Sequence, residues 1–240
     1  MPSSPSPSPT PDNAFRGAAL PAFIALLALT IVVTAFYQLQ RADSAVRLTR
    51  SMLGPTPVTV YRDDNLPAGD KRPVVVIAHG FAGSQQLMAS FAIALARSGY
   101  LAVSFDYYGH GRNLEPLRGN VTEIDGATRY LLNQTQAVVE FALTLPDASG
   151  ELALLGHSMA SDIVVRYAQQ DPRVDATIAV SMFSPEVTAS TPTNLLVIVG
   201  NLEGFLKVEA LRVLGMVTDN PQPGVTVVDG ESGDARRVAF

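Results

Sequence analysis

From Val58 onward, short apolar runs rich in β-branched residues alternate with stretches in which apolar residues recur at helical spacing. One apolar run, Pro73–Ala78, is continuous, which is typical of a strand covered on both faces of a parallel sheet. Further strands are expected at Leu101–Phe105 and Leu152–Leu155. The helical stretches between them are residues 84–98 and 127–145. Regular alternation of this kind predicts right-handed crossovers and an α/β fold built on an open, mostly parallel, doubly wound sheet.

Further elements extend the pattern on both sides. We expect an edge strand at Val58–Tyr61, strands at Ala176–Ser181 and Leu195–Val199, a helix at Phe205–Leu214, and the beginning of a last strand at Ala235–Phe240. The chain has 240 residues, of which 47% are hydrophobic, so it contains enough apolar material for the core of one large domain.

Charge and composition exclude several classes of partner and site. The net charge is −5 and no run of lysine or arginine occurs, which argues against nucleic acid as the main partner. Without cysteine, the chain has no disulfide, thiol nucleophile or thiolate metal site. The histidine and carboxylate spacings are not typical of a metal-ligand set, and we expect no cofactor. The sequence indicates no particular oligomeric state.

The N-terminal part divides into a tail and an uncharged stretch. Residues 1–16 begin with alternating serine and proline, and we expect them to be disordered. Within residues 17–38, the stretch Gly17–Tyr37 has no charge, and at about 1.5 Å per residue such a helix crosses a hydrocarbon core of ~30 Å. We therefore expect a transmembrane helix acting as a signal-anchor. A cleaved signal peptide has a shorter apolar region of about 7–15 residues, and a buried core helix rarely runs so long uncharged.

The residues around this helix bear on its orientation and on the domain boundary. Arg16 precedes the helix and three arginines follow it, so positive-inside counting favours the cytoplasm for the C-terminal part: Arg41, Arg47 and Arg50. Residues 39–56 are expected to form a membrane-proximal connector that ends in the structure-breaking Gly-Pro-Thr-Pro sequence at 54–57. The soluble domain is then residues 57–240.

The stretch Glu151–Ala168 places Ser158 between an apolar run and a helical pattern. A serine on a sharp strand-to-helix turn with strained backbone angles needs small residues two positions away on either side, and Gly156 and Ala160 meet this requirement. Ala160 replaces the second glycine of the usual G-x-S-x-G. Taken alone, the pentapeptide GHSMA is equally compatible with an ordinary strand-loop-helix junction.

Three strand ends carry further residues of interest, because chemistry in such sheets gathers at the carboxyl ends of strands. The loop HGFAGS at 79–84 can aim backbone N–H groups at a developing oxyanion, or it is a plain turn with a helix cap. In the loop DYYGHGR at 106–112, two glycines give a tight turn whose polar side chains are compatible with a purely structural role. The loop GNLEG at 200–204 places one carboxylate, Glu203, beyond a strand end, where a solvated carboxylate is the alternative.

In this order and spacing, the motifs HGFAGS, DYYGHG, GHSMA and VGNLEG resemble the α/β-hydrolase family, from about Thr56 to the end of the chain. The resemblance implies a sheet of α/β-hydrolase type. It also implies that Ser158 is the nucleophile and that the N–H groups of Met159 and Phe81 form the oxyanion hole. Glu203 would hold the acid position of the triad, where the family more often has aspartate. Only residues 182–194 separate the strands where the family often inserts a lid, so no sizeable lid domain is expected.

The expected catalytic base is missing from its family position. A serine hydroxyl needs a base to take its proton, and the family supplies a histidine after the final strand, yet residues 205–240 contain none. The three histidines lie in the HG loop, in the D-x-x-G-H-G turn and beside the nucleophile, where none is placed to act as base: His79, His110 and His157. We therefore expect an α/β-hydrolase truncated before its catalytic histidine.

The sequence is compatible with two functions. The first is a membrane-anchored serine hydrolase that acts on ester, thioester or peptide-like acyl substrates and is impaired for lack of the histidine. The alternative is a catalytically dead pseudo-hydrolase that serves as a binding or scaffolding domain. A dinucleotide-binding domain on the same alternating pattern is disfavoured, because no G-x-G-x-x-G follows the first strand.

Overall fold

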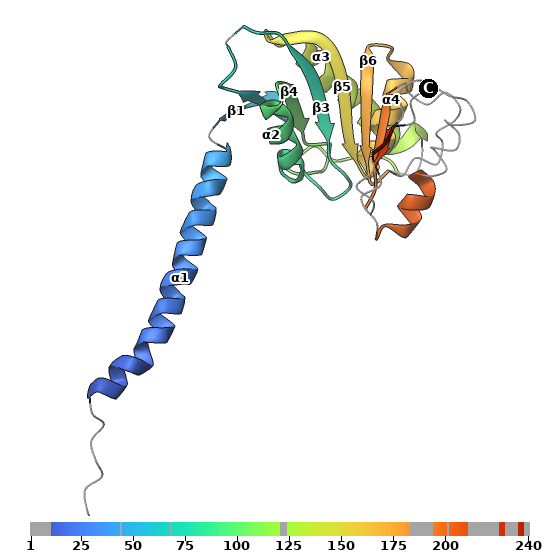
Figure 1. Ribbon diagram of the computed structural model, residues 1–240. Helices are drawn as coiled ribbons and strands as arrows, with labels where there is room; N and C mark the ends of the chain where they lie inside the picture. Colours follow the sequence, from blue (N-terminus) through green and yellow to red (C-terminus); the bar gives the residue numbers. More distant parts are fainter. Residues whose placement is uncertain are drawn as a thin grey trace, which may run out of the picture. The chain divides into compact units, whose positions relative to one another are not determined.

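A computed structural model describes most of the chain, drawn as a ribbon in Figure 1: residues 11–43, 45–67, 69–120, 124–182, 194–200, 202–210, 226–228 and 235–237. The chain divides into two units, Met1–Ala45 and Val46–Phe240. The described residues of the first unit form one long helix, and those of the second form the sheet and the helices that pack on it.

The first unit is the helix α1, Pro11–Asp43. Within it, Leu20–Gln38 has a mean hydropathy of 2.3 and none of it is buried, so this helix is long and apolar enough to cross a membrane. An N-terminal signal sequence can meet the same criterion of length and hydropathy. The helix extends beyond the predicted span of 17–38 at both ends. Residues 11–16, which we expected to be disordered, belong to the helix, because the serine-proline alternation stops at Pro11 and proline is tolerated in a first turn.

The second unit is organised by a nine-stranded sheet in the order β1-β2-β4-β3-β5-β6-β7-β8-β9. Its strands are β1 Val46–Leu53, β2 Thr56–Asp63, β3 Arg72–Ala78, β4 Leu101–Phe105, β5 Ala148–His157, β6 Val174–Val180, β7 Leu195–Ile198, β8 Thr226–Val228 and β9 Ala235–Arg237. Neighbours from β4 to β8 run parallel, whereas β1 with β2, β2 with β4, and β8 with β9 are antiparallel. The predicted mostly parallel α/β sheet is confirmed.

Strand β1 lies inside residues 39–56, where we expected a connector. It pairs along its whole length with β2, from Val46 opposite Asp63 to Leu53 opposite Thr56. As a result, β1 is the edge strand and β2 is an inner strand with neighbours on both sides, contrary to the prediction for Val58–Tyr61. The second unit therefore begins at Val46 rather than at residue 57.

Alternate residues of the central strands explain why their sequences are continuously apolar. In β3, Val74 and Val76 point into one core with α3 and α4, whereas Val75 and Ile77 point into a second core with α2. All four side chains are at most 2% exposed. The sheet is thus covered on both faces, as the run at 73–78 predicts.

The helices of the second unit follow the predicted places with small differences. They are α2 Ala89–Arg97, α3 Arg129–Leu143 and α4 Met159–Gln170, with a 3₁₀ turn η1 at Gln85–Met88 and a π turn η2 at Ile124–Thr128. Residues 204–210 are also helical, and the rest of the helix expected at 205–214 lies outside the described residues. The stretch expected to lack a lid, 182–194, also falls largely outside the described part, as does the end of the last expected strand beyond Arg237.

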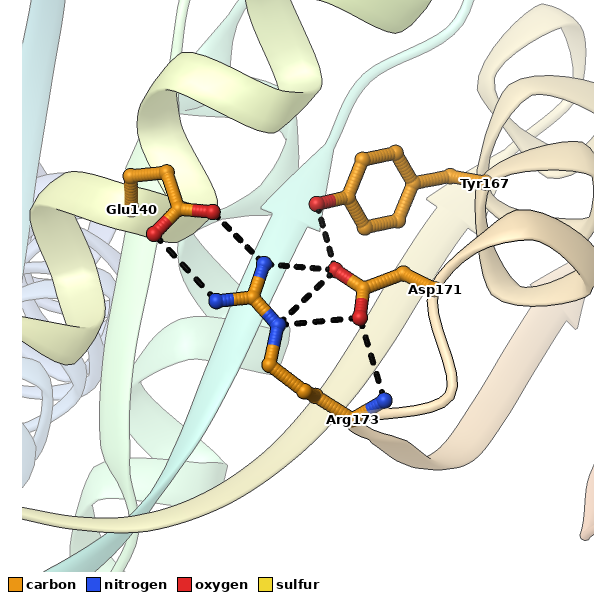
Figure 2. A network of polar contacts seen from close by, with 4 residues as sticks. All are labelled: Glu140, Tyr167, Asp171 and Arg173. Atoms are coloured by element: carbon orange, nitrogen blue, oxygen red, sulfur yellow. Dashed lines mark hydrogen bonds and ion pairs between the residues drawn. The ribbon is translucent and has the colours of Figure 1, made fainter.

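Arg173 joins α3 to the turn between α4 and β6 (Figure 2). Its Nη2 donates to Glu140 Oε1 at 2.6 Å and to Asp171 Oδ2 at 2.7 Å. The hydroxyl of Tyr167, on α4, donates to Asp171 Oδ2 at 2.8 Å. This network lies at the amino end of β6, away from the strand ends that carry the candidate site.

Candidate active site

Ser158 is the only residue between the end of β5 and the start of α4. Its φ of 53° and ψ of −118° place it in a region that residues with a side chain avoid, at a cost of ~1–3 kcal/mol. Hydrogen bonds on both sides hold this conformation, since Ser158 N donates to Val180 O at 2.9 Å and Ser161 N donates to Ser158 O at 2.8 Å. The strand-to-helix turn therefore has the strained backbone that the sequence pattern predicts for an elbow.

Gly156 shows why small residues flank the turn. A Cβ at this position would collide with the carbonyl group of Ala160 and lie 2.8 Å from Cγ2 of Val164. Ala160 itself is fully buried in the first turn of α4. The first turn of α4 thus packs directly on the end of β5, and any side chain at Gly156 would force the two apart.

The HGFAGS loop lies against this turn. Strands β3 and β5 are neighbours, with Ala78 opposite Gly156, so the loops that follow them meet. A Cβ at Gly80 would lie 3.0 Å from Ser158 Cβ and 3.0 Å from His157 Nδ1. Gly83 N donates to Gly80 O at 3.0 Å and closes the loop as a tight turn, with the Phe81 side chain 64% exposed. Gly80 and Ser158 lie against each other. Phe81 follows Gly80 directly in the chain, and Met159 follows Ser158.

Glu203 lies beyond the carboxyl end of β7 and is held by two groups. The hydroxyl of Ser181 donates to its Oε1 at 2.9 Å and its Oε2 at 3.0 Å, and Gly200 N donates to Oε2 at 2.8 Å. Strands β5 and β7 are separated only by β6, which places their ends roughly 10 Å apart. The half-buried carboxylate is therefore ordered at the same edge of the sheet as Ser158.

Ser181 is a site residue that sequence reasoning missed. It follows β6 directly, has a φ of 50°, and its N–H donates to Ile198 O at 2.7 Å. In the sequence it stands at the end of an ordinary strand pattern, and nothing there indicates a positive φ or a contact with Glu203.

His79 is a structural histidine. Its Nε2 accepts a hydrogen bond from Tyr107 N at 3.1 Å, so Nδ1 carries the proton and donates to Gly80 O at 2.8 Å. The side chain is completely buried, and this burial lowers its pKa. With both ring nitrogens occupied, His79 ties the loop after β3 to the loop after β4.

The other two histidines flank this arrangement. His110 is buried, with Nδ1 2.7 Å from Tyr108 O, and its ring packs against those of His79 and Phe81 at centroid distances of 5.3 and 5.5 Å. His157 is half-buried beside Gly80. Among the described residues, no histidine makes a hydrogen bond to the hydroxyl of Ser158.

The DYYGHGR loop is fixed by the buried carboxylate of Asp106. Its oxygens accept from Gln85 N at 2.8 Å, Gln85 Nε2 at 2.9 Å and Arg112 N at 3.1 Å. Gly111 has a φ of 55°, and a side chain there would collide with this carboxylate. The contacts of this loop are structural, because the carboxylate of Asp106 joins the loop after β4 to η1.

Comparisons with known proteins identify the family of the chain. A family model described as serine aminopeptidase, S33 (Hydrolase_4) matches residues 69–222, more than half of the chain. Over 134 residues the chain is 28% identical to a monoacylglycerol lipase from Mycolicibacterium smegmatis. That match covers 54% of this chain and 44% of the lipase, so the chain spans less than half of the length of this curated relative.

Two solved structures resemble the fold. A protein from Klebsiella pneumoniae subsp. pneumoniae, provisionally described as a dienelactone hydrolase, has a TM-score of 0.54 at 17% identity, covering 78% of this chain and 87% of its own. A hypothetical protein from Pseudomonas aeruginosa has a TM-score of 0.50 at 16% identity, covering 75% of this chain and 56% of its own. At these identities the likeness concerns the fold alone.

Proposed function

Because this chain belongs to the serine aminopeptidase S33 family of α/β-hydrolases, we propose that it is a serine hydrolase in which Ser158 attacks ester, thioester or peptide-like acyl groups. The observation that carries the proposal is the position of Ser158. It occupies a strained turn with a φ of 53°, in contact with the loop that contains Gly80. Strain of this kind persists only where the surrounding structure holds it, and it is typical of functional sites.

In the proposed reaction, Oγ of Ser158 bonds to the acyl carbon while its proton passes to a base, and the carbonyl electrons move onto oxygen. The N–H groups of Met159 and Phe81 are proposed to stabilise that oxyanion. Met159 is the first residue of α4, so its N–H lies at the positive end of the helix dipole. The oxyanion then collapses, and the leaving group departs with the proton held by the base and leaves an acyl-serine. Water hydrolyses this ester, which releases the acid and restores Ser158.

Glu203 is proposed as the acid that orients the base. Its ordering by Ser181 and Gly200 at the end of β7 supports this role, because a triad carboxylate has to be fixed to hold an imidazole in one orientation. The 240-residue chain has three histidines, and none makes a hydrogen bond to the hydroxyl of Ser158. We therefore propose that hydrolysis by this form is impaired, with a residual rate from the oxyanion hole of at most ~10³–10⁴-fold over water.

We propose that α1 anchors the domain to a membrane. The span Leu20–Gln38 supports this by its length and by a mean hydropathy of 2.3. An anchored domain meets membrane-held acyl substrates at a raised effective concentration. Counting arginines around the helix favours the cytoplasmic side for the domain, and protease accessibility in sealed vesicles tests that orientation.

The alternative function, a pseudo-hydrolase that binds rather than cleaves, is favoured by the histidine contacts. His79 uses both ring nitrogens for backbone groups, and His110 is buried with Nδ1 on Tyr108 O. A serine without a base is a poor nucleophile, so in this case the site would bind an acyl ligand without turning it over.

Labelling with a fluorophosphonate separates the two functions, since covalent capture requires an activated hydroxyl. If the protein is a hydrolase, we expect the probe to label the full chain in detergent solution. The substitution Ser158→Ala should abolish this labelling. The matched control is Ser149→Ala, which removes an exposed hydroxyl bonded to Glu151 at the far end of β5. Labelling that survives Ser158→Ala would refute Ser158 as the nucleophile. Absence of labelling in the unmodified chain would favour the pseudo-hydrolase.

A further inference from the structure

A cavity of about 390 Å³ lies at the opposite end of the sheet from Ser158, and its charged lining residues are Arg47, Arg62, Asp63, Asp64, Arg72 and Asp147. Arg72 pairs with Ala148 at the start of β5, whereas Ala78 pairs with Gly156 at its other end. At about 3.3 Å per residue, the length of β3 separates the two ends by roughly 20 Å. The cavity is therefore distinct from the candidate active site.

Two of the three arginines in this cavity already have carboxylate partners. Arg62 donates to Asp147 through Nε at 2.7 Å and through Nη2 at 3.1 Å. Arg47 contacts Asp64 through Nη2 at 2.9 Å and through Nε at 3.1 Å. Each pair uses both oxygens of its carboxylate.

The third arginine, Arg72, has no such partner. Its side chain is buried, with the residue only 6% exposed, and its Nε and Nη1 make no hydrogen bond to any described residue. Its backbone N–H donates to Asp147 O at 2.8 Å, which fixes the main chain beside the cavity. No described carboxylate oxygen lies within 4.0 Å of the guanidinium. A buried guanidinium without a partner is costly, because its charge and its N–H groups lose their hydration.

We propose that this cavity binds a small oxyanion, a carboxylate or phosphate group, through the guanidinium of Arg72. The planar, always charged guanidinium matches carboxylate and phosphate oxygens in geometry as well as in charge. Asp63 also lines the cavity, with its Oδ1 accepting from Asn65 N at 2.8 Å. With Asp64 and Asp147 it makes three aspartates against the three arginines of the lining, so the formal charges of the lining balance. We therefore expect a ligand with a single negative charge to be preferred over a more highly charged one. The proposal does not depend on the function of Ser158.

The test is calorimetric titration of the full chain, in neutral detergent and at constant ionic strength, with acetate and with inorganic phosphate as separate probes. We expect saturable binding of at least one probe by the unmodified chain. The variant Arg72→Met should weaken that binding by roughly 10- to 100-fold, the loss expected for charge-assisted hydrogen bonds. The matched control Arg50→Met, which removes an exposed arginine from β1, should leave it unchanged.

Arg72→Lys is the second variant, in case Arg72→Met does not fold. It keeps the charge but loses the planar array of donors, so we expect binding weaker than in the unmodified chain. Absence of saturable binding of either probe by the unmodified chain would overturn the proposal and assign the cavity to water. Equal binding by the unmodified chain and by either Arg72 variant would overturn it too.

Discussion

The hydroxyl of Ser181 donates to both carboxylate oxygens of Glu203, at 2.9 and 3.0 Å. Ser181 stands directly after β6 with a φ of 50°, so one strained residue holds the proposed acid of the adjacent strand. The backbone of the same residue bonds to Ile198 O at 2.7 Å, which ties the ends of β6 and β7 together. The position of Glu203 thus depends on the conformation of a neighbouring strand end.

Removal of this hydroxyl should cost stability. We expect Ser181→Ala to lower the free energy of unfolding by about 1.5–3 kcal/mol, the range for a hydrogen bond to a charged group. Ser181→Gly loses the same bond but relieves the positive φ, so its loss should be smaller. Urea unfolding of the two variants measures the difference. If Ser181→Gly is the less stable of the two variants, the positive φ at residue 181 does not carry the conformational strain that we infer from it.

The contact between β5 and α4 gives a second prediction. Gly156→Ala places a methyl group against the carbonyl group of Ala160 and 2.8 Å from Val164 Cγ2, so we expect a loss of about 1–3 kcal/mol or more. Gly204→Ala is the matched control, because a Cβ there has no neighbour within 4 Å. Denaturant unfolding followed by circular dichroism checks both. Equal stabilities would mean that the turn around Ser158 adjusts without cost.

Buried strands were the most predictable part of the fold. The strand expected at Leu101–Phe105 has those same bounds, although Ser104 interrupts its apolar run. The run at 73–78 is β3 but for one residue, because burial on both faces leaves a continuous apolar signature there. Strand β1 was missed for the opposite reason. Of its residues only Val46 is buried, so no period-two hydrophobic pattern marks it.

The candidate site was predictable only where backbone geometry restricts residue type. Gly156 and Ser158 are recognisable because a strained turn with close packing admits few side chains at these positions. The bond between Ser181 and Glu203 spans 22 residues and depends on the register of β6 and β7, which no local pattern encodes. The roles of Phe81, Met159, Ser158 and Glu203 remain predictions.

The network around Arg173 (Figure 2) predicts a pH dependence of stability. Hydrogen bonds from Arg173 lower the pKa of Asp171 to about 2, and a hydrogen bond from the same guanidinium lowers the pKa of Glu140. Since these folded-state values lie below the ordinary carboxylate values of about 4, the network stabilises the fold at pH above about 4. Its contribution should be lost as the pH falls from about 4 towards 2.

Comparison of the unmodified chain with Arg173→Met tests this dependence. We expect the free energy of unfolding of the unmodified chain to fall more steeply between pH 4 and pH 2 than that of the variant. Glu140 is half exposed, with a side-chain exposure of 51%, so salt should screen its share. Arg47→Met, which removes an arginine from an exposed pair, is the control and should leave the acid slope nearly unchanged. Parallel slopes for all three proteins would contradict the prediction.

His79 predicts a second pH dependence, in a higher range. Burial lowers its pKa below the ordinary value of about 6.5, so in the acid range the unfolded chain binds a proton that the folded chain excludes. The free energy of unfolding should therefore decline as the pH falls below about 6.5. His79→Phe removes the titrating group. The variant leaves Tyr107 N and Gly80 O without their ring partner, so we expect it to be less stable at every pH. Its free energy of unfolding should nevertheless change less between pH 6.5 and pH 5 than that of the unmodified chain. His110 and His157 remain in both proteins, so the difference between the two slopes isolates His79. If the slopes coincide, His79 accepts a proton in the folded state, and its hydrogen bond from Tyr107 N must then open to accommodate it.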